Sequence, residues 1–277
     1  MLTLVTGATG RVGSRFTPRL IAQGSSARVL VRDPAAAGAL SDHGAELARG
    51  DLRDRDSVRR GLEGVDAVVH LAAAFRGVAD EESRAVNDAA TVALAKDALS
   101  AGVSRFVFTS TNLVYGSGQG RPAREDDPLF PTRSYPETKV AAEGTLRALD
   151  GLGLRIVRLA FVYGDGDPHL AESLRFTSGW PSHQRIHLVH HADVAQALIR
   201  VLCAAGVDGR TYNVADDAPV TAYELRVLNR QEPATQAHER TLQDPWAGIV
   251  DTNRIRRELG FRPIYPSVHT ARDAGAL

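Results

Sequence analysis

Two residues of the sequence are spaced for proton transfer. Tyr135 and Lys139 lie four residues apart in the segment SYPETK, which runs from Ser134 to Lys139. On a helix, this spacing places both side chains on one face. An unperturbed phenol has a pKa of about 10, and a nearby ammonium group favours the phenolate. The pair is therefore typical of general acid–base chemistry, with Tyr135 as the group that transfers the proton.

Lysine is rare in this chain, which strengthens the interpretation of Lys139. Lys96 and Lys139 are the two lysines among 33 lysine and arginine residues. The alternative is a surface helix that carries an unrelated tyrosine and lysine. Ser134 and Glu137 have the spacing of a capping box, and Pro136 fits only a first helical turn. We therefore predict a helix that begins at Tyr135.

A glycine-rich segment follows the first predicted strand. It reads TGATGRVG from Thr6 to Gly13 and has the spacing G-x-x-G-x-x-G. Glycine permits a tight turn and close approach of a pyrophosphate, whose charge is favoured at a helix N-terminus. Arg11 is a second candidate phosphate contact, although a solvated arginine at the helix start is an equal alternative. We predict a dinucleotide site with these contacts: Gly7, Thr9, Gly10, Arg11, Val12 and Gly13.

The end of the second predicted strand bears on the choice of cofactor. Its last residues are Val31, Arg32 and Asp33. In dinucleotide-binding folds an acidic residue here holds the ribose 2′-hydroxyl of NAD, whereas an arginine favours the 2′-phosphate of NADP. Arg32 directly follows the apolar run, so NADP(H) is favoured. Asp33 keeps NAD(H) as the alternative.

Repeated strand and helix patterns must position these residues. Apolar runs predict strands at 2–6, 28–32, 46–49, 67–71, 106–110 and 154–159. Helical spacing predicts helices at 11–23, 54–61, 81–101 and 137–150. This alternation indicates an α/β fold, a Rossmann-type doubly wound parallel sheet.

The pattern becomes irregular after Leu159. The stretch 164–185 reads as a long loop, followed by a helix at 191–204, a strand at 210–214 and a helix at 253–259. We therefore predict one NAD(P)-binding domain over 1–277. A small C-terminal substrate lobe would come mainly from 164–190 and 210–277.

Composition excludes several other classes of protein. Basic and acidic residues balance at 33 each, which disfavours nucleic acid as a partner. No apolar run approaches the roughly 20 residues of a membrane span, and we expect a cytoplasmic setting.

His190 and His191 are adjacent and therefore point in different directions, so no metal site is expected. Trp180 could stack on a planar substrate, although packing within the lobe is the favoured interpretation.

Together these motifs resemble the extended or atypical short-chain dehydrogenase/reductases, which include sugar-nucleotide epimerases, dehydratases and many ketoreductases. Asp51 and Leu52 resemble the family's adenine-contacting pair. Asn87 lies where the family carries a helix asparagine near the active site. The family's cofactor-lining segment after strand four is matched by Leu71, Ala72 and Ala73.

The resemblance also implies a catalytic hydroxyl. The segment TSTNLVYG resembles the end of the family's fifth strand, where the residue four before the tyrosine is the catalytic serine or threonine. That residue is Thr111 here, with Ser110 as the less favoured candidate. The resemblance implies that Lys139 also holds the nicotinamide ribose. Pro136 directly after Tyr135 departs from the usual pattern and could tilt the first turn.

The favoured function is an NADPH-dependent ketoreductase that acts on a small or medium organic carbonyl compound. Arg32 and a lobe short for gripping a nucleotide diphosphate support it. The first alternative is a nucleotide-sugar epimerase or dehydratase with tightly bound NAD, for which Arg175 and Arg185 are candidate diphosphate ligands. The second is a non-enzymatic dinucleotide-sensing regulator. The family often dimerises through the helices that correspond to 81–101 and 137–150, so the resemblance allows a homodimer without fixing the oligomeric state.

Overall fold

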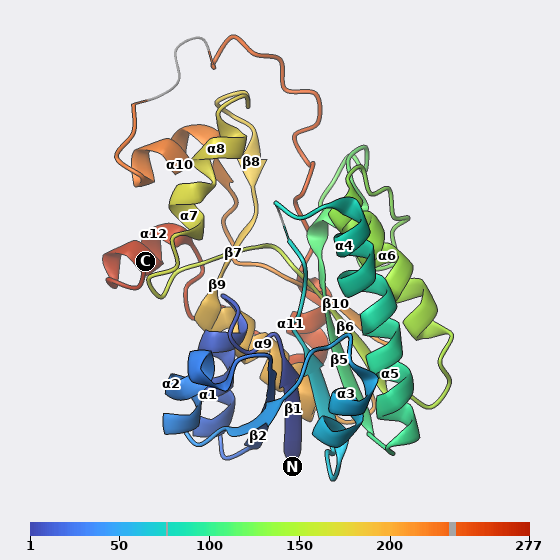
Figure 1. The fold of residues 1–277 in the computed structure, drawn as a ribbon. Helices are drawn as coiled ribbons and strands as arrows, with labels where there is room; N and C mark the ends of the chain where they lie inside the picture. Colours follow the sequence, from blue (N-terminus) through green and yellow to red (C-terminus); the bar gives the residue numbers. More distant parts are fainter. Residues whose placement is uncertain (76, 233–236) are drawn as a thin grey trace.

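Seven parallel strands form the main sheet of the protein (Figure 1). The computed structural model describes residues 1–75, 77–232 and 237–277. The strand order is β10-β6-β5-β4-β1-β2-β3, and the chain leaves β1 first in one direction and then in the other. This order confirms the predicted doubly wound sheet. The strands are β1 (Leu2–Thr6), β2 (Ser26–Val31), β3 (Glu46–Arg49), β4 (Ala67–His70), β5 (Arg105–Thr111), β6 (Leu154–Leu159) and β10 (Thr211–Val214).

Helices cover both faces of this sheet (Figure 1). Successive strand residues point to opposite faces, so Val5 packs with the helices on one face while Leu4 packs with the helices on the other. Burying one such aliphatic side chain stabilises the fold by about 1.5–3 kcal/mol. The helices on the two faces are α1 (Gly13–Ala22), α2 (Gly38–Asp42), α9 (His191–Cys203), α3 (Arg55–Leu62), α5 (Thr91–Ser100) and α6 (Ser134–Arg147).

A lobe with its own apolar core lies above the carboxyl ends of the strands (Figure 1). Tyr163, Leu188 and Leu225 are fully buried in that core. The parallel pair β7 and β9 leads from the sheet into the lobe. The elements of this region are β7 (Phe161–Tyr163), α7 (His169–Glu172), α8 (Leu174–Thr177), β8 (Arg185–Ile186), β9 (Leu188–His190), β11 (Val220–Thr221), α10 (Ala222–Leu228) and α12 (Val268–Asp273).

The structure corrects two expectations for the second half of the chain. The stretch 164–185 contains α7 and α8 and is not one long loop. Helices of four residues are too short to show an apolar period, so packing of Leu170 in the lobe core fixes them. β10 pairs with β6 in the main sheet, and α11 (Asn253–Leu259) packs on β10. These two segments therefore belong to the sheet layers rather than to the lobe.

The helical stretch predicted at 81–101 is interrupted by a π-helical segment, Ala85–Ala90, between α4 (Asp80–Arg84) and α5. Its wider turn gives the Thr91 hydroxyl a hydrogen bond to the carbonyl oxygen of Val86, five residues earlier. Such π-segments often occur at functional sites. No helix in the described ranges is long and apolar enough to cross a membrane.

Candidate active site

A cavity of about 700 Å³ opens where β1, β4, β5 and β6 end. Ligands of open α/β sheets bind at this edge, beside the point where the strand order reverses. The sheet side contributes Gly7, Gly10–Gly13, Leu71–Ala73, Thr109–Asn112, Tyr135 and Lys139. The lobe side contributes Asp167, His169, Phe176, Trp180, Arg185 and His191. The glycine loop and the predicted proton-transfer pair therefore share one cavity.

Tyr135 and Lys139 face this cavity from successive turns of α6. Tyr135 is half-buried, whereas Lys139 is 1% exposed. The Lys139 Nζ donates a hydrogen bond to the carbonyl oxygen of Thr109 at 3.0 Å and lies 5.9 Å from the centre of the Tyr135 ring. Burial lowers the pKa of Lys139 to about 8. The pair thus has the relative placement that acid–base chemistry requires.

The start of α6 differs from the prediction. The helix begins at Ser134, and Arg133 has the extended backbone of the N-cap, with φ −143° and ψ 157°. Because Ser134 is already helical, its hydroxyl does not cap the helix, and its buried Oγ has no hydrogen-bond partner among the described residues. The predicted capping box is therefore wrong. Pro136 sits in the first turn, where its missing N–H has no intrahelical partner to lose.

Two buried hydroxyls edge the cavity at the end of β5. The Thr111 Oγ1 accepts a hydrogen bond from the backbone N–H of Leu113 at 3.3 Å. Its own hydrogen stays available to a ligand oxygen. The Ser110 Oγ is buried without a hydrogen-bond partner in the described structure, so both hydroxyls remain candidates for contact with substrate.

The glycine loop suits a pyrophosphate. Gly7 has φ +68°, and a Cβ there would lie 2.5 Å from the backbone N of Ala72. A Cβ on Gly13 would lie 2.2 Å from the carbonyl oxygen of Gly7. No side chain of the described residues caps the start of α1. The backbone N–H groups of Ser14 and Arg15 donate to loop carbonyl oxygens, whereas those of Val12 and Gly13, which line the cavity, have no backbone acceptor in the described structure and can face an anion. Thr9 is exposed and lies outside the cavity lining.

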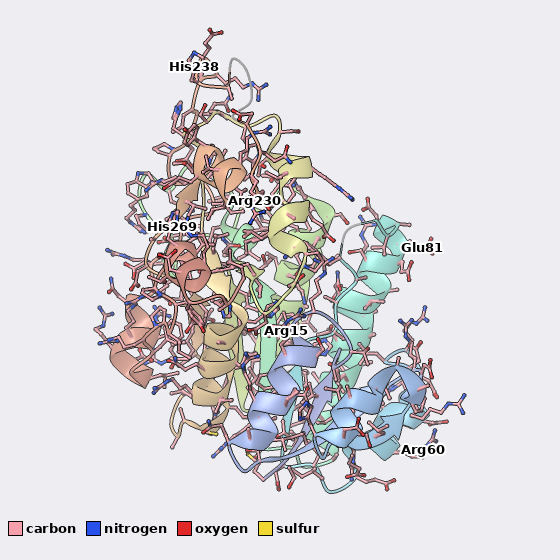
Figure 2. All side chains as sticks on the ribbon, turned by 90° about the vertical axis from the view of Figure 1, so that its left-hand side faces the viewer. Arg15, Arg60, Glu81, Arg230, His238 and His269 are labelled. Carbon is pink, nitrogen blue, oxygen red and sulfur yellow. The ribbon has the colours of Figure 1, made fainter. Side chains whose placement is uncertain are left out.

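Arg11 bridges the glycine loop and the lobe. Its guanidinium contacts Asp167 at 3.0 Å and Glu172 at 2.9 Å. It is thus engaged in ion pairs rather than simply solvated, and it lines the cavity beside the loop. Arg15, in the first turn of α1, donates to the carbonyl oxygen of Asp165 and marks the end of α1 that faces the lobe (Figure 2).

The Asp167 carboxylate was not anticipated from the sequence. It accepts a hydrogen bond from the His191 Nε2 at 2.9 Å, and both side chains are 1% exposed. Burial lowers the pKa of His191 to about 4, and its bond to Asp167 offsets this only in part. The imidazole is therefore neutral near pH 7, with its buried Nδ1 unpaired in the described structure.

The predicted adenine-side residues lie beyond the cavity lining, at the ends of β2 and β3. Arg32 is exposed. The Asp33 carboxylate caps the following turn by accepting from the backbone N–H of Ala35 at 3.0 Å. Asp51 pairs with Arg53 at 3.0 Å, and this hydrogen-bonded pair lowers the pKa of Asp51. The half-buried Leu52 packs on the core beneath.

Asn87 is a positioning residue rather than a catalytic one. It is fully buried and lies outside the cavity lining. Its Oδ1 accepts from the backbone N–H of Ala74 at 2.7 Å, and its Nδ2 donates to the Ala74 carbonyl at 2.9 Å. A further contact joins it to Thr138 at 3.2 Å. These bonds use both ends of the amide, so Asn87 holds the segment after β4 against α6.

A buried ion pair fixes α6 to the sheet. Arg158 on β6 contacts Glu143 on α6 at 2.5 Å and 3.0 Å, and both side chains are 2% exposed. Arg158 also donates to the Tyr115 hydroxyl at 2.8 Å, and that hydroxyl donates to Asn213 on β10 at 2.7 Å. This network sets the orientation of the helix that carries Tyr135. In the described ranges no three His, Cys, Asp or Glu side chains gather as a metal site.

Comparison with known proteins agrees with this geometry. Residues 3–215 match the NAD dependent epimerase/dehydratase family. Sterol demethylase protein B of Methylococcus capsulatus is 38% identical over 175 residues, which is 60% of this chain and 53% of that protein, so the match spans about half of the relative. A Stigmatella aurantiaca relative, 4-hydroxy-2-methyl-3-oxo-4-farnesyl-3,4-dihydroquinoline-1-oxide ketoreductase, is 33% identical over 82% of this chain and 70% of its own length.

Among solved structures, dTDP-glucose 4,6-dehydratase DesIV from Streptomyces venezuelae, with NAD and TYD bound, superimposes with a TM-score of 0.80. It is 26% identical, and the match covers 99% of this chain and 97% of that one. The chain therefore belongs to the NAD dependent epimerase/dehydratase family.

Proposed function

We propose that the protein is an NADPH-dependent ketoreductase that reduces the carbonyl group of a small or medium organic molecule. The observation that carries this proposal is the convergence of Tyr135, Lys139 and Thr111 on the cavity that also contains the glycine loop. The Stigmatella relative, a ketoreductase by name, supports the same reaction class.

In this proposal each side chain has a separate task. The dinucleotide, when bound, supplies the hydride that reaches the carbonyl carbon. Tyr135 donates its hydroxyl proton to the carbonyl oxygen, so that the ketone becomes an alcohol. Thr111 donates a hydrogen bond to the same oxygen and orients it, and the Lys139 ammonium favours the phenolate that remains. Proton transfer from a positioned group contributes about 10²–10⁴ in rate.

The preference for NADPH rests on Arg32. Its exposed guanidinium follows β2 directly, where the ribose of a bound dinucleotide would lie. Asp33, the residue that would hold an unphosphorylated ribose, is already engaged in its own turn. This arrangement favours a 2′-phosphate over a 2′-hydroxyl.

The second candidate is a nucleotide-sugar epimerase or dehydratase, supported by the family and by the DesIV fold. Dehydration would require a further acid–base group beside Tyr135. Among the described residues that line the cavity, Asp167 is the carboxylate, and it is paired with Arg11 and His191. Of the candidate diphosphate ligands, Arg185 lines the cavity, whereas the exposed Arg175 lies outside the lining.

Cofactor release and exchange test the proposal. The purified protein is denatured, any released dinucleotide is identified, and the emptied protein is titrated with NADPH and with NADH. We expect a weakly held, exchangeable cofactor and tighter binding of NADPH. Stoichiometric NAD that survives purification, together with conversion of a nucleotide sugar without added cofactor, would overturn the ketoreductase proposal in favour of the second candidate.

A further inference from the structure

We propose that the substrate is a ketone with an aromatic or extended apolar body, held against an aromatic wall formed by Phe161, Phe176 and Trp180. This inference rests on the proposed ketone reduction and adds the chemical class of the substrate. The three side chains come from β7, from α8 and from the turn after α8, and all three line the cavity.

The wall is continuous. The ring centres of Phe161 and Phe176 are 6.0 Å apart, and those of Phe176 and Trp180 are 5.9 Å apart with an interplanar angle of 67°. These separations are typical of favourable aromatic contacts. Each ring is only partly buried, so the cavity exposes apolar surface that a ligand could remove from water.

The wall also leads to the proton donor. The Phe161 ring stacks on His169 with the ring centres 4.0 Å apart, and Phe75 lies 6.3 Å from the same histidine. The Phe75 ring meets the Tyr135 ring edge to face at 4.6 Å. A chain of rings thus runs from Tyr135 to Trp180. If the substrate carbonyl group lies at Tyr135, the rest of the substrate would lie along this surface.

Of the three arginines that line the cavity among the described residues, Arg11, Arg133 and Arg185, two are already engaged in contacts. Arg11 is paired with Asp167, at the glycine loop rather than beside the wall. Arg185 stacks on Trp246, with its guanidinium carbon 4.8 Å from the ring centre, and donates to the Pro245 carbonyl at 2.8 Å. A nucleotide diphosphate would have to break these contacts to bind Arg11 or Arg185, which leaves Arg133 at the start of α6, whereas an apolar body would gain by covering the rings.

Two ketones of contrasting polarity test the inference in the full-length protein with NADPH. 2-Acetonaphthone carries a fused aromatic body, and hydroxyacetone is small and hydrophilic. We expect a kcat/KM for 2-acetonaphthone at least about 100-fold higher, because the preference for one apolar group in a pocket already reaches 10–200-fold. In Trp180→Ala and Phe176→Ala, the ratio of the two kcat/KM values should fall about tenfold or more.

Tyr223→Ala is the matched control, because Tyr223 is a 49% exposed aromatic residue of the lobe outside the cavity lining. It should leave the ratio unchanged. Equal or better reduction of hydroxyacetone, or equal losses for both ketones in the wall variants, would overturn the aromatic-body inference and leave ketone reduction intact.

Direct binding separates failure of the inference from failure of the proposed function. Quenching of tryptophan fluorescence by 2-acetonaphthone is measured in the wild type and in Phe176→Ala, which keeps both tryptophans. Binding that Phe176→Ala weakens supports the inference even if neither ketone is reduced. If 2-acetonaphthone does not bind, the aromatic-body inference is overturned. If the protein reduces no ketone but converts a nucleotide sugar, the proposed function is overturned.

Discussion

The ammonium group of Lys139 and the carbonyl oxygen of Thr109 form a hydrogen bond of 3.0 Å that joins α6 to the end of β5. Lys139 is buried and also lies 4.7 Å from the centre of the Phe108 ring. The bond holds the cation in a fixed place beneath Tyr135. Its partner is a backbone oxygen, so it does not depend on the side chain at position 109.

Replacement of Tyr135 by phenylalanine should reduce kcat for ketone reduction by about 10²–10⁴, because the proton donor is lost while the ring remains. The dissociation constant for NADPH should change little. Steady-state kinetics and fluorescence titration check the two expectations. Tyr223→Phe is the control, since it removes a hydroxyl from the lobe surface. Retention of full activity in Tyr135→Phe would show that another group donates the proton.

Ketone reduction should fall as the pH rises through about 8, where Lys139 loses its charge. Burial favours the neutral amine, so the cation is present below that pH and is lost above it. The pH profile of kcat/KM checks this expectation. Lys139→Met should lower kcat/KM by about 10²-fold or more and remove that limb of the profile. A wild-type profile that stays flat to pH 10 would contradict the role of Lys139.

Replacement of Arg32 by alanine should weaken NADPH binding by about 10-fold or more, as expected for loss of one charge-assisted phosphate contact. NADH binding should change much less. Arg60→Ala is the control, because Arg60 is an exposed arginine on α3 and lies at the opposite end of the molecule from the lobe (Figure 2). Equal losses for both dinucleotides in Arg32→Ala would remove the basis for an NADPH preference.

Removal of only one partner of the buried pair Arg158 and Glu143 should strongly destabilise the fold. Arg158→Met leaves the buried Glu143 carboxylate with only the longer contact to Arg147, at 3.8 Å, and should lower the free energy of unfolding by about 3–5 kcal/mol. The double variant Arg158→Met/Glu143→Leu should recover much of that loss, since neither charge of the pair remains. Chemical denaturation measures both. A double variant as unstable as the single one would assign the loss to packing rather than to charge.

Asp216 should make stability depend on pH. Burial raises the pKa of this carboxyl from 3.8 to about 8 in the folded protein. The folded state therefore holds the proton that the unfolded state releases above about pH 4. The contribution of Asp216 is fully present below that pH and is lost as the pH rises to about 8.

The side chain in Asp216→Asn cannot titrate. The free energy of unfolding of this variant relative to the wild type should therefore rise by about a few kcal/mol between pH 4 and pH 8 and then level off. Melting temperatures across this range check the trend. Asp42→Asn, at an exposed carboxylate that ends α2, is the control and should leave the pH dependence of the wild type unchanged. A constant difference across pH in Asp216→Asn would contradict the assignment.

The sequence alone determined the sheet and the local motifs. The predicted bounds of β1, β3 and β6 coincide with those observed. The strand β1 is buried and reads as a continuous apolar run, whereas β3 is a short edge strand whose exposed ends carry Glu46 and Arg49. The glycine loop and the segment from Tyr135 to Lys139 could also be located, since each is a short contiguous motif whose spacing sets its geometry.

The tertiary structure decided the rest of the site. Asp167, Phe161 and Trp180 reach the cavity only because the lobe folds over the ends of the strands. Asn87 resembled a catalytic residue in sequence, yet its amide is saturated by the segment after β4. Short helices and contacts between distant segments leave no period in the sequence. Packing against elements far along the chain therefore fixed the substrate side of this site, whereas local chain geometry fixed the cofactor loop.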